Sequence, residues 1–343
     1  MACSKVAVAL SGGLDSAVSA ALLQKQGYEI FGVTMDLCKA GCISVVEDAC
    51  KVASLLRIPH HVVDFSDDFE ERVVTPLCHG YASGETPNPC VSCNRDLKFG
   101  LLLNHIKKLG ADYLATGHYA RIINVETGHA LCKAIDPIKD QTYFLYTLKS
   151  SVLASLLFPV GRFLKCEVAK MAEDFGLPVS PDRESHDICF MAGNNYRTFL
   201  KKRISTSTGK IYDINGREVG EHSGISNYTI GQRQGINLGQ SERLYVISID
   251  PQTNSLVVGP ESCLFTNTLN AGDLTWISGF PPDDNLQLKA KIRYQAPEST
   301  VKLLPGVGCI QVIFDTPVKA PAPGQSIVFF NGDRVLGGGI IRS

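Results

Sequence analysis

A short apolar stretch followed at once by a glycine- and serine-rich turn constrains this chain most. Residues 6–10 form an unbroken apolar run, which is the pattern of a strand buried on both faces. Residues 11–13 (Ser-Gly-Gly) end that run, and residues 17–26 are predicted to form a helix that stops at Gly27. The first elements expected are therefore a strand, a tight turn and a helix.

The turn between that strand and that helix is predicted to bind an anion. Its two glycines let the backbone approach a phosphate closely, and N–H groups at the start of the helix point toward it. Ser11 and Ser16 add hydroxyl donors, Asp15 is placed to hold Mg²⁺, and Asp15 or Ser16 is expected to cap the helix. The competing interpretation is an ordinary strand-to-helix turn.

The sequence of this turn, Ser-Gly-Gly-Leu-Asp-Ser over residues 11–16, is more specific than an isolated glycine pair. It is not a Walker loop, because no Gly-Lys-Ser/Thr follows. It resembles the loop of the PP-loop ATP pyrophosphatases, which cleave ATP to AMP and pyrophosphate and leave their substrate adenylated. The loop indicates what is done to ATP but not which substrate is adenylated.

Length and composition limit the class of protein. The 343 residues suffice for two or three domains, and 44% hydrophobic with 20% charged residues is typical of a globular protein. No apolar run approaches the roughly 18 residues of a membrane span, and no signal peptide precedes the first strand. We therefore expect a cytoplasmic protein without a membrane partner, in which the 12 cysteines are reduced. With a net charge of −1, any RNA-binding surface must be local.

The first half of the chain alternates strands and helices, which predicts a parallel sheet with helices on both faces. The expected strands are residues 30–35, 61–65 and 113–116, and the expected helices are residues 44–56 and 96–109. Ligands of such sheets lie beyond the carboxyl ends of the strands. A nucleotide there would have its phosphates at residues 11–16, its adenine near Met35 and its ribose or α-phosphate near Gly117. For Met35, an ordinary core position is the alternative.

The second half changes character after about residue 204. Helical patterns continue over residues 151–157, 166–175 and 196–203, and the last of these carries four cations in seven residues, a candidate contact for a phosphate backbone. Short apolar runs separated by Gly, Pro, Asn and Asp then predict an all-β region. The expected strands are residues 210–213, 244–249, 255–258, 286–294, 310–314 and 326–330, with a domain break near residues 262–270.

Two cysteine sites stand out as reactive. Cys90 and Cys93 form a Cys-x-x-Cys pair in a proline-bound loop just before the helix expected over 96–109, and Cys189 lies far along the chain. A structural zinc site would need four ligands, and Cys38 with Cys42 would have to supply two of them. A thioredoxin-like redox motif is a further alternative. The remaining cysteines are interpreted as small buried hydrophobic residues.

An ATP-cleaving loop together with reactive cysteines indicates a specific chemistry. ATP would adenylate an oxygen and so make it a leaving group, which sulfur then replaces. One cysteine can carry that sulfur as a persulfide, and a second can attack the persulfide, release hydrosulfide and leave a disulfide.

On these motifs the chain is similar, over nearly its whole length, to the tRNA-specific 2-thiouridylases. These enzymes convert the wobble uridine of certain tRNAs (position 34) to 2-thiouridine, using ATP, Mg²⁺ and a persulfide sulfur. The matching stretches are residues 11–16, 88–99, 116–121, 139–145, 158–161, 185–190, 227–235, 293–294 and 323–329.

The resemblance implies a role for each matching residue. Cys189 corresponds to the persulfide carrier and Cys93 to the nucleophile that acts on it. The implied ATP contacts are Ala9, Leu10, Ser11, Gly12, Gly13, Leu14, Asp15, Ser16, Met35 and Gly117. The implied target-base segment is Asn88, Pro89 and Cys90. The implied tRNA contacts are Lys139, Asp140, Gln141, Arg293 and Tyr294, and less firmly His118 and Gln325.

The resemblance also implies an architecture and partners. We expect an α/β PP-loop domain over residues 1–203, a small β-rich central domain over 204–265 and a β-barrel over 266–343. The partners would be tRNA and a protein that donates persulfide sulfur, either a cysteine desulfurase or a relay protein. Another PP-loop ligase or amidotransferase, and an ATP-dependent RNA-binding or zinc module, remain the competing functions.

Two features depart from the family pattern. Many members carry aspartate where this chain has Cys90, and the loop over residues 37–43 is short. The first departure creates a set of three cysteines, Cys90, Cys93 and Cys189, which would suit a [4Fe–4S] cluster with one open iron that binds hydrosulfide. The persulfide and the cluster mechanisms use the same cysteines, so both stay open at this point.

Overall fold

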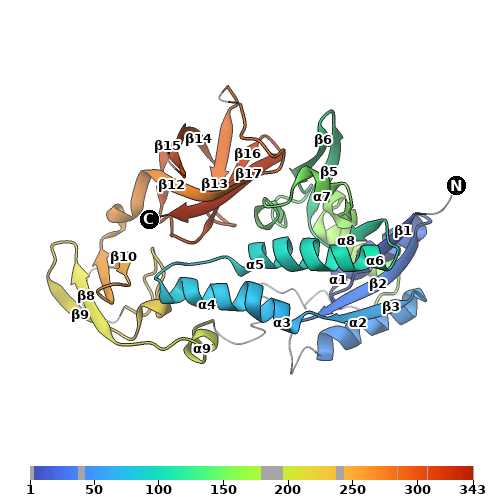
Figure 1. Ribbon diagram of the computed structural model, residues 1–343, viewed down its shortest axis with the longest axis horizontal. Helices are drawn as coiled ribbons and strands as arrows, with labels where there is room; N and C mark the ends of the chain where they lie inside the picture. Colours follow the sequence, from blue (N-terminus) through green and yellow to red (C-terminus); the bar gives the residue numbers. More distant parts are fainter. Residues whose placement is uncertain are drawn as a thin grey trace.

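The computed structural model of the chain describes residues 4–37, 43–178, 196–236, 243–283, 285–306 and 308–342. Figure 1 shows an α/β domain that contains the N-terminus, a small β domain, and a barrel formed by the last part of the chain. The predicted fold class, a parallel α/β domain followed by a β-rich domain and a β-barrel, is confirmed. In the described part of the chain, every helix is too short or too polar to cross a bilayer.

A parallel sheet forms the centre of the α/β domain. Within the described residues it has five strands, and neighbouring strands all run in the same direction. In spatial order they are β3 (His60–Asp64), β2 (Glu29–Asp36), β1 (Lys5–Ala9), β4 (Tyr113–Ala115) and β7 (Leu156–Leu157). The centre of β1 is buried completely, because Ala7 faces one layer of helices while Val6 and Val8 face the other.

Helices cover both faces of this sheet. On one face lie α1 (Leu14–Lys25), α2 (Ile43–Leu56) and α8 (Lys165–Asp174). On the other face lie a continuous helix made of α5 (Pro89–Ser92), the π-helical η2 (Cys93–Leu102) and α6 (Leu103–Lys108), together with α7 (Ser150–Leu153). We call the continuous helix of residues 89–108 the cysteine helix, because it carries Cys90 and Cys93.

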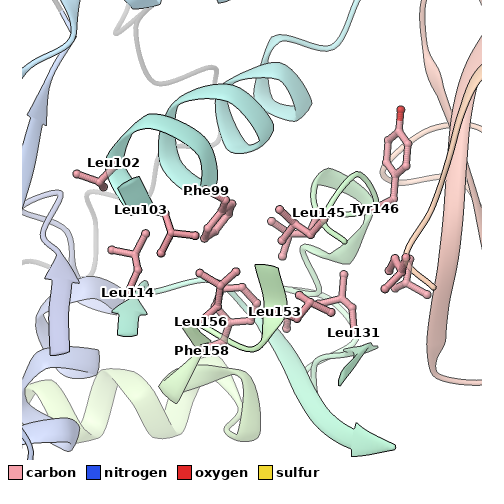
Figure 2. Close-up of a cluster of buried hydrophobic side chains, with 14 of the residues drawn as sticks. Phe99, Leu102, Leu103, Leu114, Leu131, Leu145, Tyr146, Leu153, Leu156 and Phe158 are labelled. Atoms are coloured by element: carbon pink, nitrogen blue, oxygen red, sulfur yellow. The ribbon is translucent and has the colours of Figure 1, made fainter. Parts of the chain in front are cut away.

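One apolar core joins the first domain to the barrel. Figure 2 shows Phe99, Leu102 and Leu103 of the cysteine helix above Leu114 and Leu156 of the sheet. Val328 and Phe330 of the barrel strand β16 belong to the same buried cluster. Burying each such large side chain stabilises the fold by about 1.5–3 kcal/mol. The barrel therefore packs against the first domain through a continuous core.

The rest of the chain is mostly antiparallel β-structure. The central sheet has the order β10 (Tyr245–Asp250), β11 (Ser255–Gly259), β8 (Gly209–Asp213) and β9 (Glu218–His222). The barrel strands, in spatial order, are β12 (Phe265–Trp276), β15 (Ile310–Lys319), β14 (Ser299–Pro305), β13 (Leu288–Lys291), β16 (Ser326–Asn331) and β17 (Arg334–Arg342). Pairing of β12 with β17 closes the barrel, and the hairpin of β5 (Ala120–Val125) and β6 (Gly128–Lys133) extends its sheet from the first domain.

Several predicted elements need correction. The segment predicted as one helix over residues 151–157 is the short helix α7 followed by β7, because Leu156 and Leu157 pair with β4. The helix predicted from residue 96 already begins at Pro89, so the cysteine pair lies within the helix and not in a loop before it. The first helix begins at Leu14 with Gly13 as its N-cap, and no side chain caps it.

Other elements were not predicted from the sequence. A helical stretch precedes the cysteine helix and contains α3 (Ser66–Phe69), the π-helical η1 (Glu70–Val74) and α4 (Thr75–Ala82). By contrast, the helical pattern predicted over residues 196–203 corresponds to the six-residue helix α9 (Tyr196–Lys201), which leads to the central domain. Short 3₁₀ turns complete the description: η3 (Thr142–Phe144), η4 (Pro159–Arg162), η6 (Ile225–Asn227) and η7 (Glu261–Leu264).

Candidate active site

The glycine loop, residues 11–16, lies at the carboxyl end of β1, where an anion-binding turn was predicted. Gly12 has φ +70°, and a Cβ at this position would lie 2.8 Å from the Cβ of Asp48 in α2. Only glycine satisfies both the backbone angle and the close approach. Because no side chain caps α1 at Gly13, the N–H groups of its first turn face the position where a phosphate would bind.

Two serines fix the shape of the loop from inside. The Ser16 hydroxyl donates to the carbonyl of Gly13 over 2.9 Å and accepts from the Ser11 N–H at 3.2 Å. Ser16 is buried, whereas Ser11 is exposed. The hydroxyl of Ser11 is therefore better placed to meet a ligand than that of Ser16, which acts mainly within the loop.

Asp15 does not present an open carboxylate to a metal ion. The Lys165 ammonium at the start of α8 donates to both carboxylate oxygens, at 2.7 and 2.9 Å, and the Tyr119 hydroxyl donates to Oδ1 at 2.9 Å. Asp15 therefore forms an ion pair with Lys165 in this structure, and its role as a magnesium ligand stays a prediction.

Lys165 was missed by the sequence analysis, although a signal exists. It is the first residue of α8, where a positive charge opposes the helix dipole and is unfavourable without an acidic partner. Such a lysine indicates a nearby carboxylate or anionic ligand. Its position beside Asp15 adds a cation to the glycine loop, which suits a ligand with several phosphate charges.

The other predicted ATP contacts lie around the same edge of the sheet. Gly117 follows β4 and packs on the loop, where a Cβ would lie 2.7 Å from the backbone N of Ser16. Met35 lies near the end of β2 and is half-buried between two apolar clusters. The Leu10 N–H donates a hydrogen bond to the Val33 carbonyl, and the Leu10 carbonyl accepts one from the Thr34 hydroxyl. Ala9 ends β1, and Leu14 starts α1 as a buried residue.

The cysteine helix begins at a well-defined cap. The Asn88 side chain accepts from the N–H of Cys90 at 3.1 Å, and Pro89 occupies the first helical turn. Cys93 is 8% exposed and packs in an apolar cluster with Phe69 and Leu97. Cys90 is half-buried and, at a spacing of three residues, shares a helix face with Cys93.

The second predicted reactive cysteine lies outside the described residues. Cys189, and also Cys38 and Cys42 of the alternative zinc site, belong to stretches that the structure does not describe. The predicted pairing of Cys93 with Cys189, and the three-cysteine iron–sulfur set, therefore stay predictions. Within the described residues, no group of three His, Cys, Asp or Glu side chains is arranged to hold a metal ion.

The predicted tRNA-contact segment around Asp140 is held from inside the protein. The Asp140 carboxylate accepts from the N–H of Ala134 at 2.9 Å and from the Thr142 hydroxyl at 2.6 Å, and burial raises its pKa. The Gln141 side chain accepts from the N–H of Tyr119 at 3.0 Å. Lys139 is partly exposed. Asp140 and Gln141 thus have internal roles, and their contact with RNA stays a prediction.

The predicted contacts from the barrel also bridge domains. Arg293 donates from Nη2 to the carbonyls of Ile230, at 3.1 Å, and Ala320, at 2.6 Å, and burial lowers its pKa. The Tyr294 ring lies 4.6 Å from the ring of Phe144, centroid to centroid. These residues join the barrel to the central and first domains, and their role in binding tRNA stays a prediction.

Gln325 contacts the chain just before the cysteine helix. Its side-chain amide donates to the Thr86 carbonyl at 2.8 Å, and the Thr86 N–H donates to the Pro323 carbonyl at 2.8 Å. The barrel thereby fixes the segment that enters the helix at Asn88. This internal contact is what the structure assigns to Gln325.

A cavity of about 470 Å³ adjoins the start of the cysteine helix. Its wall includes Asn88 and Pro89 of the predicted target-base segment, Ser326 of the barrel, and Thr147. The Thr147 hydroxyl is buried and has no hydrogen-bond partner within the described structure. The sequence analysis did not identify Thr147, because a lone threonine carries no motif.

His118 is packed among aromatic rings and is neutral. Its ring lies 5.7 Å from Phe99 and 5.8 Å from Phe158, and Nδ1 is 2.7 Å from the Thr116 hydroxyl. Burial, with a smaller contribution from Lys98, lowers the pKa of His118 well below 6.5. The predicted contact of His118 with tRNA is not tested by this geometry.

The neutral state of His118 predicts a pH-dependent stability. Below pH 6.5 the unfolded chain binds a proton at His118 that the folded chain does not, so the unfolding free energy falls by up to about 1.4 kcal/mol per pH unit. Above pH 6.5 the contribution is fully present. We expect His118→Phe to flatten the decline of melting temperature between pH 6.5 and 5. Parallel declines in both proteins would contradict a neutral His118 in the folded chain.

Comparison with known proteins agrees with this architecture. A parallel α/β sheet with a glycine loop at the end of its first strand defines a HUP-type domain, and residues 4–193 match the family model described as "tRNA methyl transferase HUP domain". Residues 197–260 match the "tRNA methyl transferase PRC-barrel domain" and residues 266–341 the "Aminomethyltransferase beta-barrel domain". The predicted domain limits at 203 and 265 stay predictions.

Full-length relatives define the family. The chain is 41% identical to the tRNA-specific 2-thiouridylase MnmA of Pelotomaculum thermopropionicum, covering 99% of this chain and 97% of that protein. It is 44% identical to the enzyme of the same name from Pelobacter propionicus, covering 99% and 98%. The chain belongs to the tRNA-specific 2-thiouridylase MnmA family. A solved 4-thiouridine synthetase–RNA complex has 19% identity over 58% of this chain and 50% of that chain, with a TM-score of 0.36, too low to support an inference.

Proposed function

We propose that this protein is a tRNA uridine 2-sulfurtransferase that converts the wobble uridine at position 34 to 2-thiouridine at the expense of ATP. The observation that carries the proposal is the presence, in one α/β domain, of a glycine loop at an uncapped helix start and a cysteine near the start of a second, capped helix. Membership of the MnmA family names tRNA as the substrate class. We expect the reaction to take place in the cytoplasm.

The first half of the proposed reaction activates the uridine. The C2 oxygen of uracil attacks the α-phosphorus of ATP, pyrophosphate leaves, and the oxygen becomes part of an adenylate. The N–H groups of the first turn of α1 bind the departing phosphates, and the Lys165 ammonium offsets their charge. Mg²⁺ is expected to arrive with the nucleotide, since Asp15 is already paired.

The second half replaces oxygen by sulfur. A donor protein passes sulfur to Cys189, which becomes a persulfide. The Cys93 thiolate attacks the inner sulfur, the sulfur bonded to the Cys189 side chain, so that a Cys93–Cys189 disulfide forms and hydrosulfide leaves. Hydrosulfide adds to C2 of the adenylated uracil, and AMP departs with the original oxygen. A reductant of the thiol class then returns both cysteines to thiols.

The cavity at the start of the cysteine helix supports the placement of the target base. Asn88 and Pro89 form part of its wall, whereas Cys93, one helical turn later, is not among the residues that line it. A base must leave its stack to reach a reactive group inside a protein. A cavity of about 470 Å³ beside the cysteine helix offers space for such an extruded nucleotide.

The iron–sulfur variant of this function uses the same residues. Cys90 and Cys93 supply two thiolates from one helix face, and Cys189 would supply the third. Iron and sulfide analysis of protein purified without oxygen separates the two mechanisms. About four irons per chain would favour the cluster, whereas thiolation by iron-free protein with a persulfide donor would favour the disulfide route.

The proposed function predicts a defined product. Purified protein, incubated with ATP, Mg²⁺, a persulfide donor and unmodified tRNA carrying uridine at position 34, should form 2-thiouridine. Mass spectrometry of the digested nucleosides measures it, and release of pyrophosphate should depend on tRNA. A small-molecule ligase would release pyrophosphate without modifying tRNA, and an RNA-binding module would bind tRNA and leave every base unchanged. Either result would refute the proposal.

A further inference from the structure

Two hydrogen-bonded routes connect the glycine loop to one surface segment, residues 136–141. The first route passes through Tyr119, which is 2% exposed. Its hydroxyl donates to Oδ1 of Asp15 at 2.9 Å. Its backbone N–H donates to the side-chain oxygen of Gln141 at 3.0 Å, and its carbonyl accepts from the Gln141 N–H at 2.9 Å. A single buried residue thus contacts both the loop and the segment.

The second route passes through Lys165. Its ammonium donates to both oxygens of Asp15, while its backbone N–H donates to Oδ2 of Asp136 at 2.9 Å. The other oxygen of Asp136 accepts from the N–H groups of Ile138, at 2.9 Å, and Lys139, at 3.2 Å. Asp136 is itself buried, so these contacts are shielded from water.

The two routes meet at both ends. At the loop they share the Asp15 carboxylate, where the Lys165 ammonium also lies 5.7 Å from the centre of the Tyr119 ring. At the other end both reach the 136–141 segment, whose Ile138 side chain is 83% exposed. One end of the network therefore lies at the surface and the other lies in the predicted phosphate site.

Binding of a polyphosphate at the glycine loop is expected to weaken the ion pair between Asp15 and Lys165. The Lys165 ammonium pairs with the Asp15 carboxylate, and phosphate oxygens at the glycine loop would compete with that carboxylate for it. Any shift of Lys165 acts on Asp136 through the backbone of α8, and any shift of Asp15 acts on Tyr119. Conversely, a ligand that fixes the 136–141 segment restricts Tyr119 and Lys165 before the polyphosphate arrives.

We propose that Tyr119 and Lys165 are positioning residues that couple the 136–141 segment to the glycine loop, so that RNA contact at this segment tightens the binding of ATP. The inference rests on the proposed function, because it takes RNA as the ligand of the segment. Coupling between two sites is reciprocal, so ATP tightens the binding of RNA by the same factor.

The test measures binding alone. The dissociation constant of a non-hydrolysable ATP analogue is determined with and without a saturating, unmodified tRNA transcript that carries uridine at position 34. The wild-type protein should bind the analogue at least about fivefold more tightly with tRNA, the lower end of typical coupling between sites. Tyr119→Phe removes only the hydroxyl that reaches Asp15 and should reduce this factor to below two. Tyr113→Phe, at a tyrosine of β4 outside both routes, should keep it.

A second variant and a separate readout keep the test decisive. Asp136→Asn interrupts the other route and should also lower the coupling factor, while melting temperatures show whether each variant is folded. The inference is overturned if tRNA leaves analogue affinity unchanged in the wild-type protein, or if both variants keep the full factor. Failure of the proposed function is seen separately, as the absence of 2-thiouridine in the wild-type assay.

Discussion

Replacing Cys93 with serine should reduce tRNA thiolation at least about 10³-fold, because a hydroxyl cannot attack a persulfide or form the disulfide that releases its sulfur. The exchange changes one atom of a side chain that is 8% exposed, so the cysteine helix and the glycine loop should keep their geometry. Binding of an ATP analogue should therefore stay within about twofold of wild type, which separates a chemical defect from a folding defect. Thiolation is measured as 2-thiouridine per tRNA over time.

The chain offers a matched control for this substitution. Cys78 of α4 is also 8% exposed and belongs to the same apolar cluster as Cys93. Burial raises the pKa of the Cys78 thiol, which makes it a poor nucleophile. Cys78→Ser should therefore keep most of the activity, although it disturbs the same cluster. If Cys93→Ser retained a tenth or more of the wild-type rate, Cys93 would not be the nucleophile.

The sequence was most informative where local pattern and tertiary contact agree. The run over residues 6–10 is fully apolar because β1 is covered on both faces, and this requirement is visible in the residues themselves. The glycine loop was equally readable, since a positive φ at Gly12 and an uncapped helix start both demand small residues. These features depend on few residues that are close together in the chain.

Features that depend on distant contacts were not predicted. The strand β7 is two residues long and exists because Leu156 and Leu157 pair with β4. Two residues are too few to show the alternating hydrophobic pattern of a strand. The helical stretch before the cysteine helix carries buried Phe69, Val73 and Leu77 four residues apart, but Pro76 in the middle of the pattern resembles a break. In the structure Pro76 lies just after the π-helical η1, inside a helical stretch that runs without a break over residues 66–82.

In the candidate site, too, local features were predicted from the sequence and contacts between distant residues were not. Each residue type in the glycine loop follows from phosphate chemistry, whereas the partner of Asp15 lies 150 positions away at Lys165. Sequence reasoning proposed a metal ion as the partner of Asp15 and did not identify the Lys165 ammonium group. No rule of spacing connects two side chains that meet only because α8 packs beside α1. Charge partners across a fold therefore require the fold itself.

Gly117→Ala should have the second large effect, a loss of about 10²-fold in thiolation with a matching loss of affinity for an ATP analogue. An added Cβ would lie 2.7 Å from the N of Ser16 and 2.8 Å from the carbonyl carbon of Asp15, and both atoms are backbone in the first turn of α1. Backbone packed on the sheet cannot yield as a flexible side chain does, so the glycine loop must shift. A displacement of about 1 Å in a positioning element is enough for a loss of this size.

The control is Gly110→Ala, just before β4, where a Cβ meets no atom within 4 Å but φ is +81°. Gly110→Ala should lower the free energy of unfolding by about 1–2 kcal/mol, the cost of alanine at positive φ, and should leave ATP binding intact. Gly117→Ala involves no such angle, so a loss of analogue affinity in Gly117→Ala but not in Gly110→Ala isolates the steric contact with the loop. If a folded Gly117→Ala protein bound the ATP analogue with wild-type affinity, the edge of β4 would not shape the phosphate site. That result would refute the placement of ATP between the glycine loop and Gly117.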